Sequence, residues 1–69
     1  MAELIWLKWR AEEDGTLQVL ETRERDGELV RERRDADSLD DAAERYGEAF
    51  RELVEKVLES GSRQGRYRP

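Results

Sequence analysis

Apolar and polar residues alternate over the first eleven positions of the chain. One face of this segment carries Ile5, Leu7, Trp9 and Ala11, and the other carries Leu4 and Trp6, followed by Lys8 and Arg10. Alternation that includes aromatic and branched side chains is typical of a strand that buries one face. We therefore predict a strand over residues 3–11.

Two more strands follow, each after a turn signal. Asp14-Gly15 and Asp26-Gly27 favour turns, because glycine adopts positive φ and aspartate bonds to nearby backbone. Residues 16–24 contain a second set of branched apolar residues, and residues 28–34 are short and charged, as is typical of an edge strand. The pattern predicts a three-stranded antiparallel meander.

The register of the first hairpin decides which faces merge. A two-residue turn at Asp14-Gly15 would pair Trp9 with Leu20, whereas a three-residue loop closing at Gly15 would pair Trp9 with Val19. The second register gathers one apolar face, which consists of Ile5, Leu7, Trp9, Ala11, Leu17, Val19 and Val30. We favour it because a slip of one residue would divide that set between the two faces.

One long helix is predicted over residues 39–59. Ser38 can cap its first turn, and Gly61 is a natural stop. Its apolar residues recur at spacings of three and four; they are Leu39, Ala42, Ala43, Tyr46, Ala49, Phe50, Leu53, Val54, Val57 and Leu58. A helix of about 21 residues is roughly 31 Å long. Gly47, inside it, costs around 1 kcal/mol relative to alanine, and either permits a close backbone approach or is simply tolerated.

These elements predict an α+β fold, in which a three-stranded antiparallel meander carries one long amphipathic helix on one face (βββα). We expect a single domain over residues 1–61 and a flexible basic tail over residues 62–69. The first residues contain neither a basic segment nor a long apolar run. We therefore expect no signal peptide, no membrane span and a cytoplasmic location.

Composition limits the chemistry that the chain can perform. Its 69 residues include no cysteine and no histidine, so thiolate ligands, imidazole ligands and the usual acid–base group at neutral pH are missing. The serines have no histidine to activate them. The acidic segment from Asp35 to Asp41 lacks the glycine that a calcium loop needs at its sixth position. We therefore expect a binding protein that is not an enzyme and uses no cofactor or metal.

The net charge of −5 is unevenly distributed, with ten bases and eighteen acids in residues 1–62 and three arginines in the last seven residues. The outer side of the predicted helix forms an acidic stripe, which consists of Asp41, Glu44, Glu48, Glu52, Glu55 and Glu59. Such a stripe is either an ordinary solvated face or a ridge that docks on a basic protein surface, such as a nucleic-acid-binding groove.

Four apolar residues lie on the sheet face away from the helix in the favoured register. They are Leu4, Trp6, Leu20 and Leu29. One helix cannot cover both faces, so we expect this face to bind a protein partner or a second copy of the chain. The alternative is that the tail or a curled edge covers it.

Arginines are concentrated in the second hairpin and in the tail. They include Arg31, Arg33, Arg34, Arg63, Arg66 and Arg68. These side chains could contact nucleic acid. Acids alternate with the arginines of the hairpin, however, and cross-strand ion pairing is the simpler explanation for that part.

The predicted helix opens with Ser38-Leu39-Asp40-Asp41-Ala42-Ala43, and the first turn is Glu12-Glu13-Asp14-Gly15. Both segments resemble those of HicB-type antitoxin domains. The resemblance implies a small non-enzymatic protein that neutralises a basic RNA-cleaving toxin and often forms oligomers. The glycine-rich third-strand region of that family is replaced here by residues 29–34, and we expect neither its further strand nor its DNA-binding module.

In size and charge the chain is also similar to phage-encoded inhibitors, including anti-CRISPR and anti-restriction proteins.

We therefore predict a small inhibitor or antitoxin-like protein. It would dock its acidic helix stripe, its apolar sheet face or both on a basic, nucleic-acid-handling protein such as a nuclease or a CRISPR complex. The alternative is a nucleic-acid-binding module that uses the arginine-rich hairpin and tail.

Overall fold

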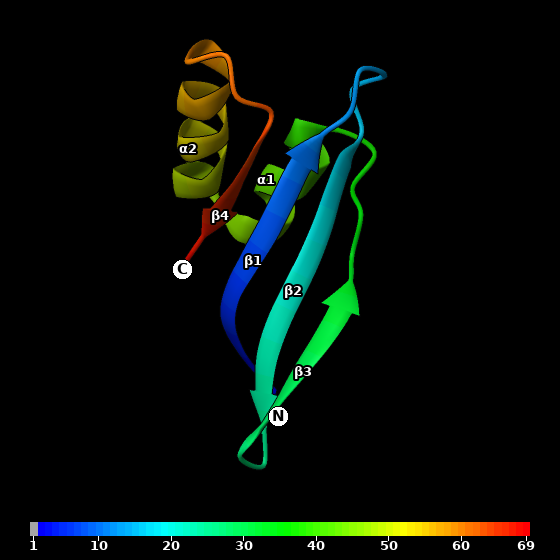
Figure 1. The fold of residues 1–69 in the computed structure, drawn as a ribbon, viewed down its shortest axis with the longest axis vertical. Coiled ribbons are helices and arrows are strands. Elements are labelled where there is room, and N and C mark those ends of the chain that lie inside the picture. Colours follow the sequence, from blue (N-terminus) through cyan, green and yellow to red (C-terminus); the bar gives the residue numbers. More distant parts are fainter. Residues whose placement is uncertain (1) are drawn as a thin grey trace.

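The computed structural model describes residues 2–69 and has an α+β fold built on a four-stranded antiparallel sheet. Along the chain the elements are β1 (Glu3–Ala11), β2 (Leu17–Arg25), β3 (Glu28–Arg33), α1 (Leu39–Tyr46), α2 (Glu48–Glu59) and β4 (Gln64–Tyr67). The strands lie in the order β3-β2-β1-β4 (Figure 1). The first three strands therefore follow one another across the sheet, and the last strand of the chain adds to the free edge of β1.

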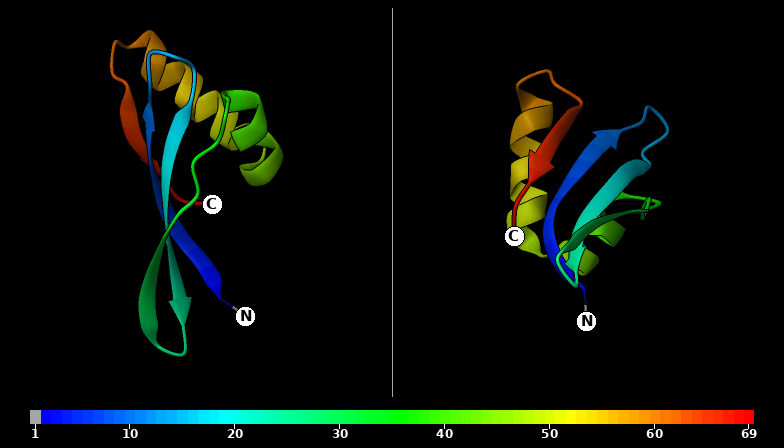
Figure 2. Two further views of the ribbon diagram at one scale, coloured as in Figure 1. Left: turned by 90° about the vertical axis from the view of Figure 1, so that its right-hand side faces the viewer. Right: turned by 60° about the horizontal axis from the view of Figure 1, so that its bottom comes forward.

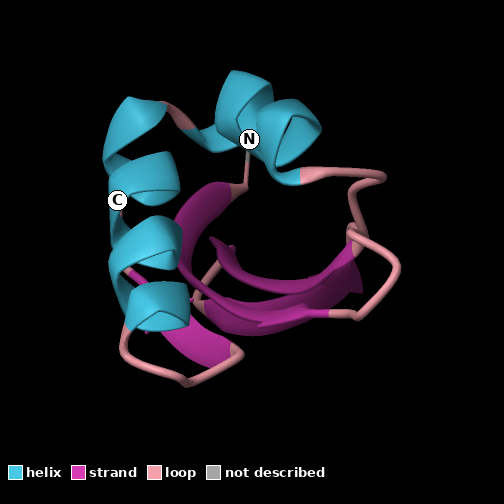
Figure 3. Ribbon diagram, turned by 90° about the horizontal axis from the view of Figure 1, so that it is seen from above, coloured by secondary structure: helices cyan, strands magenta, loops and turns pink. Residues whose placement is uncertain are grey.

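Both helices lie on the same side of the sheet (Figure 2). They meet at an angle and enclose one end of it (Figure 3), while the far end of the β2–β3 hairpin extends beyond them (Figure 1). The opposite face of the sheet carries no helix. This face of the sheet is therefore open to a partner.

The favoured register of the first hairpin is confirmed. Leu7 pairs with Glu21 and Trp9 pairs with Val19, so the apolar residues of β1 and β2 face the helices together. The buried core consists of Leu7, Trp9, Ala11, Leu17, Val19, Ala36, Ala42, Phe50 and Val54.

A β-bulge at the start of β1 contradicts one part of the sequence interpretation. Leu4 pairs with Arg23 but Trp6 pairs with Thr22, so Ile5 is an extra residue that has no partner of its own. An extra residue reverses the alternation beyond it. Leu4 therefore lies on the helix side of the sheet, and the prediction that it shares the open face with Trp6 is wrong.

The prediction of one long helix is also wrong, because the helical segment is divided at Gly47. This residue has φ 99° and ψ 171°, a backbone conformation that only glycine adopts readily. No atom lies within 4 Å of where a Cβ would stand, so glycine is needed for its conformation and not for close packing. The break lets two shorter helices follow the twisted sheet, which a straight helix of 21 residues could not do. The predicted cap at Ser38 is confirmed, since its Oγ accepts a hydrogen bond from the backbone of Asp41 at 3.1 Å.

The segment predicted as a flexible tail contains the fourth strand. β4 pairs antiparallel with β1, from Arg10 opposite Gln64 to Leu7 opposite Tyr67. Tyr67 also packs its ring edge-on against Phe50 of α2, with the ring centroids 5.3 Å apart. β4 is thus attached to both the sheet and the helix layer.

A close contact between Gly65 and Trp9 fixes the position of β4. A Cβ at residue 65 would lie 3.0 Å from Cζ2 of Trp9 and 3.2 Å from its Nε1. Trp9 is only 2% exposed and belongs to the core, so its ring cannot easily move away. Its indole N–H has no hydrogen-bond partner among the described residues, which costs roughly 1–3 kcal/mol.

We predict that Gly65→Ala displaces β4 from the sheet. The added methyl group overlaps the buried indole, and overpacking of this kind costs about 1–3 kcal/mol. Urea unfolding should show that loss of stability, and hydrogen exchange should show faster exchange at residues 64–67. Gln64→Ala, on the open face, is the control and should change neither. Unaltered exchange in Gly65→Ala would contradict the packing described here.

Candidate functional site

The open face of the sheet is basic over three successive rows of side chains. Each row runs across neighbouring strands, and the three rows together hold five bases and no acid. In order they are Gln64, Arg10 and Gln18; then Arg66, Lys8, Leu20 and Arg33; then Trp6, Thr22 and Arg31. All four strands contribute to this surface, which we call the basic face.

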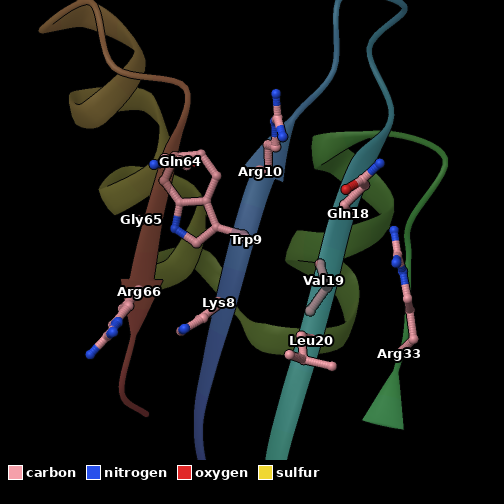
Figure 4. Close-up of a pocket in the computed structure, with 10 residues that line it drawn as sticks. All are labelled: Lys8, Trp9, Arg10, Gln18, Val19, Leu20, Arg33, Gln64, Gly65 and Arg66. Carbon is pink, nitrogen blue, oxygen red and sulfur yellow. The ribbon is translucent and has the colours of Figure 1, made fainter. Parts of the chain in front are cut away.

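A shallow hollow of about 390 Å³ lies in the basic face. Figure 4 shows the long side chains around it, with Lys8 and Arg66 on neighbouring strands at one edge and Arg33 at the other. Leu20 provides an apolar patch between them. The hollow is therefore rimmed by cations and has a partly apolar floor, an arrangement that suits an anion carrying a flat apolar group.

The five cations are only partly neutralised. Arg10 lies 3.8 Å from Glu12 and Arg33 lies 3.3 Å from Asp35, both in exposed pairs that contribute little in water. Within residues 2–69, Lys8, Arg31 and Arg66 form no ion pair. Lys8 and Arg66 also stand directly opposite each other on β1 and β4, which is unfavourable for like charges. A bound anion would relieve that repulsion.

Beyond Trp6 the character of the open face changes. The next row contains Glu3, Glu24 and Leu29, of which Leu29 is 59% exposed. This row ends the basic face on the side of the β2–β3 turn. The tip of the hairpin continues the mixture of signs, since Arg25 pairs with Glu28.

The predicted apolar face is therefore not a continuous patch. Leu4 lies on the other side of the sheet, and Leu29 lies in the acidic row. Only Trp6 and Leu20 lie in the basic face, and both are partly exposed. These two residues stand on adjacent strands, offset by two positions, a diagonal distance of about 7 Å that large side chains can span.

The six arginines of the alternative prediction are divided by the fold. Arg31, Arg33 and Arg66 come together on the basic face, although they lie up to 35 positions apart in the sequence. Arg34 lies on the helix side, where its positive charge lowers the pKa of Glu21. Arg63 hydrogen-bonds through Nε to the carbonyl oxygen of Ala11 at 3.2 Å and so helps to hold the approach to β4. Arg68 follows β4 and is exposed.

The predicted acidic stripe is exposed but divided between the two helices. Asp41 and Glu44 belong to α1, whereas Glu48, Glu52, Glu55 and Glu59 belong to α2. Arg51 bonds to Glu48 at 3.1 Å and also to Asp40 of α1, which ties the two helices together. Residues 39–59 hold seven acids and three bases. The fold thus separates charge, with acids on the outer side of the helices and cations on the open face of the sheet.

Five residues of the basic face were missed as candidate site residues, namely Lys8, Arg10, Gln18, Thr22 and Gln64. The alternation of β1 already places Lys8 and Arg10 on the face of Trp6. The alternation does not predict that β4 pairs with β1. Without Arg66 next to Lys8, the two β1 cations do not stand out from the many other charges.

A buried carboxylate on the helix side is the other unusual group. The side chain of Glu21 is 1% exposed. Its Oε2 accepts a hydrogen bond from the Tyr46 hydroxyl at 2.6 Å, and its Oε1 accepts one from Nε of Arg23 at 2.8 Å. Burial raises the pKa of Glu21, but these bonds and the charges of Arg23 and Arg34 more than offset it, so the pKa lies below its ordinary value. Burial and the bond to Glu21 raise the pKa of Tyr46.

Glu21 is engaged on both oxygens, which suits a structural link between β2 and α1 better than proton transfer.

No group of three or more His, Cys, Asp or Glu in residues 2–69 is arranged to hold a metal ion. In the same part of the chain, no helix has the length and apolar character needed to span a membrane.

No protein-family model, curated protein or solved structure matches this chain. The resemblance to HicB-type antitoxin domains therefore stays a prediction, and the function must be argued from the surface itself.

We predict that Tyr46→Phe destabilises the protein more at pH 7 than at pH 3. The folded state lowers the pKa of Glu21, so the ionised carboxylate contributes stability above its ordinary value of 4.5, and this contribution disappears as the pH falls through the folded-state value. Removing a hydrogen-bond donor lowers the free energy of unfolding by about 2 kcal/mol when its acceptor is charged, and by about 1 kcal/mol when its acceptor is neutral. Urea unfolding at the two pH values measures this difference.

Tyr67→Phe is the matched control, because its hydroxyl does not bond to Glu21. It should show no comparable dependence on pH. A loss of stability in Tyr46→Phe that is the same at both pH values would show that the hydroxyl does not stabilise the ionised carboxylate.

Proposed function

We propose that this protein binds nucleic acid through the basic face. The observation that carries the proposal is the grouping of five cations from β1, β3 and β4 in rows that contain no acid, namely Lys8, Arg10, Arg31, Arg33 and Arg66. Phosphate backbones are the commonest biological polyanions, and their neutralisation by lysine and arginine drives non-specific nucleic-acid binding. Gln18 and Gln64 add amide donors and acceptors beside Arg10.

The net charge of −5 does not prevent such binding, because seven of the eighteen acids lie on the helices, on the opposite side of the sheet, and Glu3 and Glu24 of the open face lie outside the basic face. The molecule measures 19 Å in each of its two shorter directions, whereas salt screens charges over about 8 Å at physiological ionic strength. A polyanion that approaches the helices is repelled, and one that approaches the sheet is attracted. The charge separation therefore favours one orientation of binding.

The same charges argue against a two-fold dimer through this face. In a two-fold interface each patch meets its own copy, so the five cations of one chain would face the five of the other. A partner of opposite charge avoids that repulsion, and nucleic acid supplies it.

We predict that Lys8→Gln/Arg66→Gln weakens binding of a fluorescein-labelled (dT)12 by on the order of tenfold, as expected when two exposed ionic contacts of up to about 1 kcal/mol each are removed. The slope of log affinity against log salt should fall by about 0.7 for each phosphate that is no longer neutralised. Fluorescence anisotropy between 50 and 200 mM salt measures both quantities.

Arg25→Gln/Lys56→Gln is the control for net charge. It also removes two positive charges, but from exposed positions at the hairpin tip and on α2. Binding should change little in this variant. Equal weakening in both double variants, or no binding by the unaltered protein at low salt, would refute the proposal.

A second proposal keeps the inhibitor or antitoxin-like function, with the outer side of α2 as the docking surface for a basic protein. It is favoured by the alignment of Glu52, Glu55 and Glu59 along one side of α2, where they are exposed and form no ion pair within residues 2–69. Glu48 is less available because Arg51 engages it. Both proposals are compatible, because the two surfaces lie on opposite sides.

For this second surface, reversing Glu52 and Glu55 to lysine should abolish capture of a basic protein from a lysate of the source organism, while the fold is retained. Affinity purification followed by mass spectrometry compares the two proteins. Glu28→Lys/Glu32→Lys on β3 serves as the matched reversal and should retain the partner. If the α2 reversal captures the same proteins as the unaltered chain, the acidic side of α2 is only a solvated surface.

A further inference from the structure

We infer that the nucleic acid bound by the basic face is single-stranded, and that a base stacks on Trp6. This inference rests on the proposed function and specifies its ligand. It is carried by the position of a large aromatic side chain among the cations, on a surface that is open and nearly as wide as it is long.

Trp6 and Leu20 form the apolar part of the basic face, and Trp6 lies in its last row, next to the row of Glu3 and Glu24. Arg31 lies in the row of Trp6, two strands away, while Lys8 and Arg33 flank Leu20 on either side. Thr22, between Trp6 and Arg31, is only 2% exposed although it faces away from the helices. Neighbouring side chains therefore cover Thr22 on this face of the sheet.

Apolar side chains next to cations match the two parts of an unpaired nucleotide. The base has an apolar face that stacks on aromatic side chains, and the phosphate is attracted by lysine and arginine. In a duplex the bases already stack on each other and present only their edges, so Trp6 would have no face to contact. Trp6 can therefore stack only on a base of an unpaired strand.

The width of the sheet also disfavours a duplex groove. Four strands span three spacings of about 4.8 Å, or roughly 14 Å, whereas the major groove is about 12 Å wide. A two-stranded ribbon can enter that groove, but the β2–β3 hairpin carries Glu24 and Glu28 toward its tip. The acids of the hairpin would meet the phosphates on both sides of the groove.

The basic face is also large enough for only a few nucleotides. Its three rows are separated by two residues each, so they extend over about 14 Å along the strands. This size corresponds to the short end of the range known for sheet surfaces that bind single strands, about four nucleotides. A 12-mer therefore suffices as a probe.

The test compares three probes of equal length, namely (dT)12, an abasic 12-mer with the same phosphates, and a 12-base-pair duplex. We expect (dT)12 to bind about 5- to 150-fold more tightly than the abasic strand, which corresponds to stacking of one base. Trp6→Leu should remove this preference and leave the affinity for the abasic strand unchanged. Trp6→Phe should retain part of it. Leu29→Ala, an exposed apolar residue in the acidic row, should leave it intact.

Tryptophan emission provides an independent measurement. Trp9 is 2% exposed, whereas Trp6 is partly exposed, so quenching by (dT)12 and protection from acrylamide report on Trp6. In Trp6→Leu the emission of Trp9 alone shows whether the core is still folded. Quenching by (dT)12 but not by the abasic strand supports stacking.

The outcomes separate this inference from the proposed function. Equal affinity for (dT)12 and the abasic strand, or tighter binding of the duplex, overturns base stacking while the role of Lys8 and Arg66 in phosphate binding stands. Equal loss of affinity for all probes in Trp6→Leu also overturns it, because the residue would then act only on the fold. Absence of binding to every probe overturns both.

Discussion

The contact between the indole of Trp9 and the backbone of Gly65 is the packing interaction on which the position of β4, and with it the charge of the open face, depends. Trp9 is in the core, paired with Val19 on one side, and its ring lies so close to residue 65 that only glycine fits there without displacement. The contact holds β4 on β1, with Tyr67 against Phe50 as a second attachment. Because β4 is in this position, Arg66 stands beside Lys8. A core contact on one side of the sheet thus determines the charge of the other side.

The two sides of this small fold differ in charge. Most of its acids are on the helices or at the turns, and the open sheet face carries five bases over three rows. Neither the net charge nor the composition conveys this arrangement, because both average over opposite sides of the molecule. Similarly charged side chains on neighbouring strands cost stability in the absence of a ligand. Their presence is easier to understand on a surface that binds an anion than on one that is only solvated.

Local patterns were sufficient to predict the first three strands, the register of the first hairpin and the cap at Ser38, since each depends on alternation, turn residues or a nearby side chain. Three features lay beyond them. The bulge at Ile5 lies in the apolar run Leu4–Leu7, which fits either phase of alternation. The break at Gly47 interrupts a periodicity that continues on both sides. β4 has only four residues and is set by distant partners, Trp9 and Phe50, more than by its own propensity. The basic face was missed because it depends on β4.

The shortness of β4 has a consequence for how binding and folding are linked. An edge strand of four residues can open locally at a lower free energy than the whole molecule, because a short strand has few backbone hydrogen bonds and few packing contacts. In the open state Arg66 leaves its place beside Lys8, and the basic face is left with four of its five cations. A ligand that bridges β1 and β4 binds the closed state more tightly than the open one, so it shifts the local equilibrium toward closure. Ligand binding on the sheet surface and ordering of β4 are therefore thermodynamically coupled.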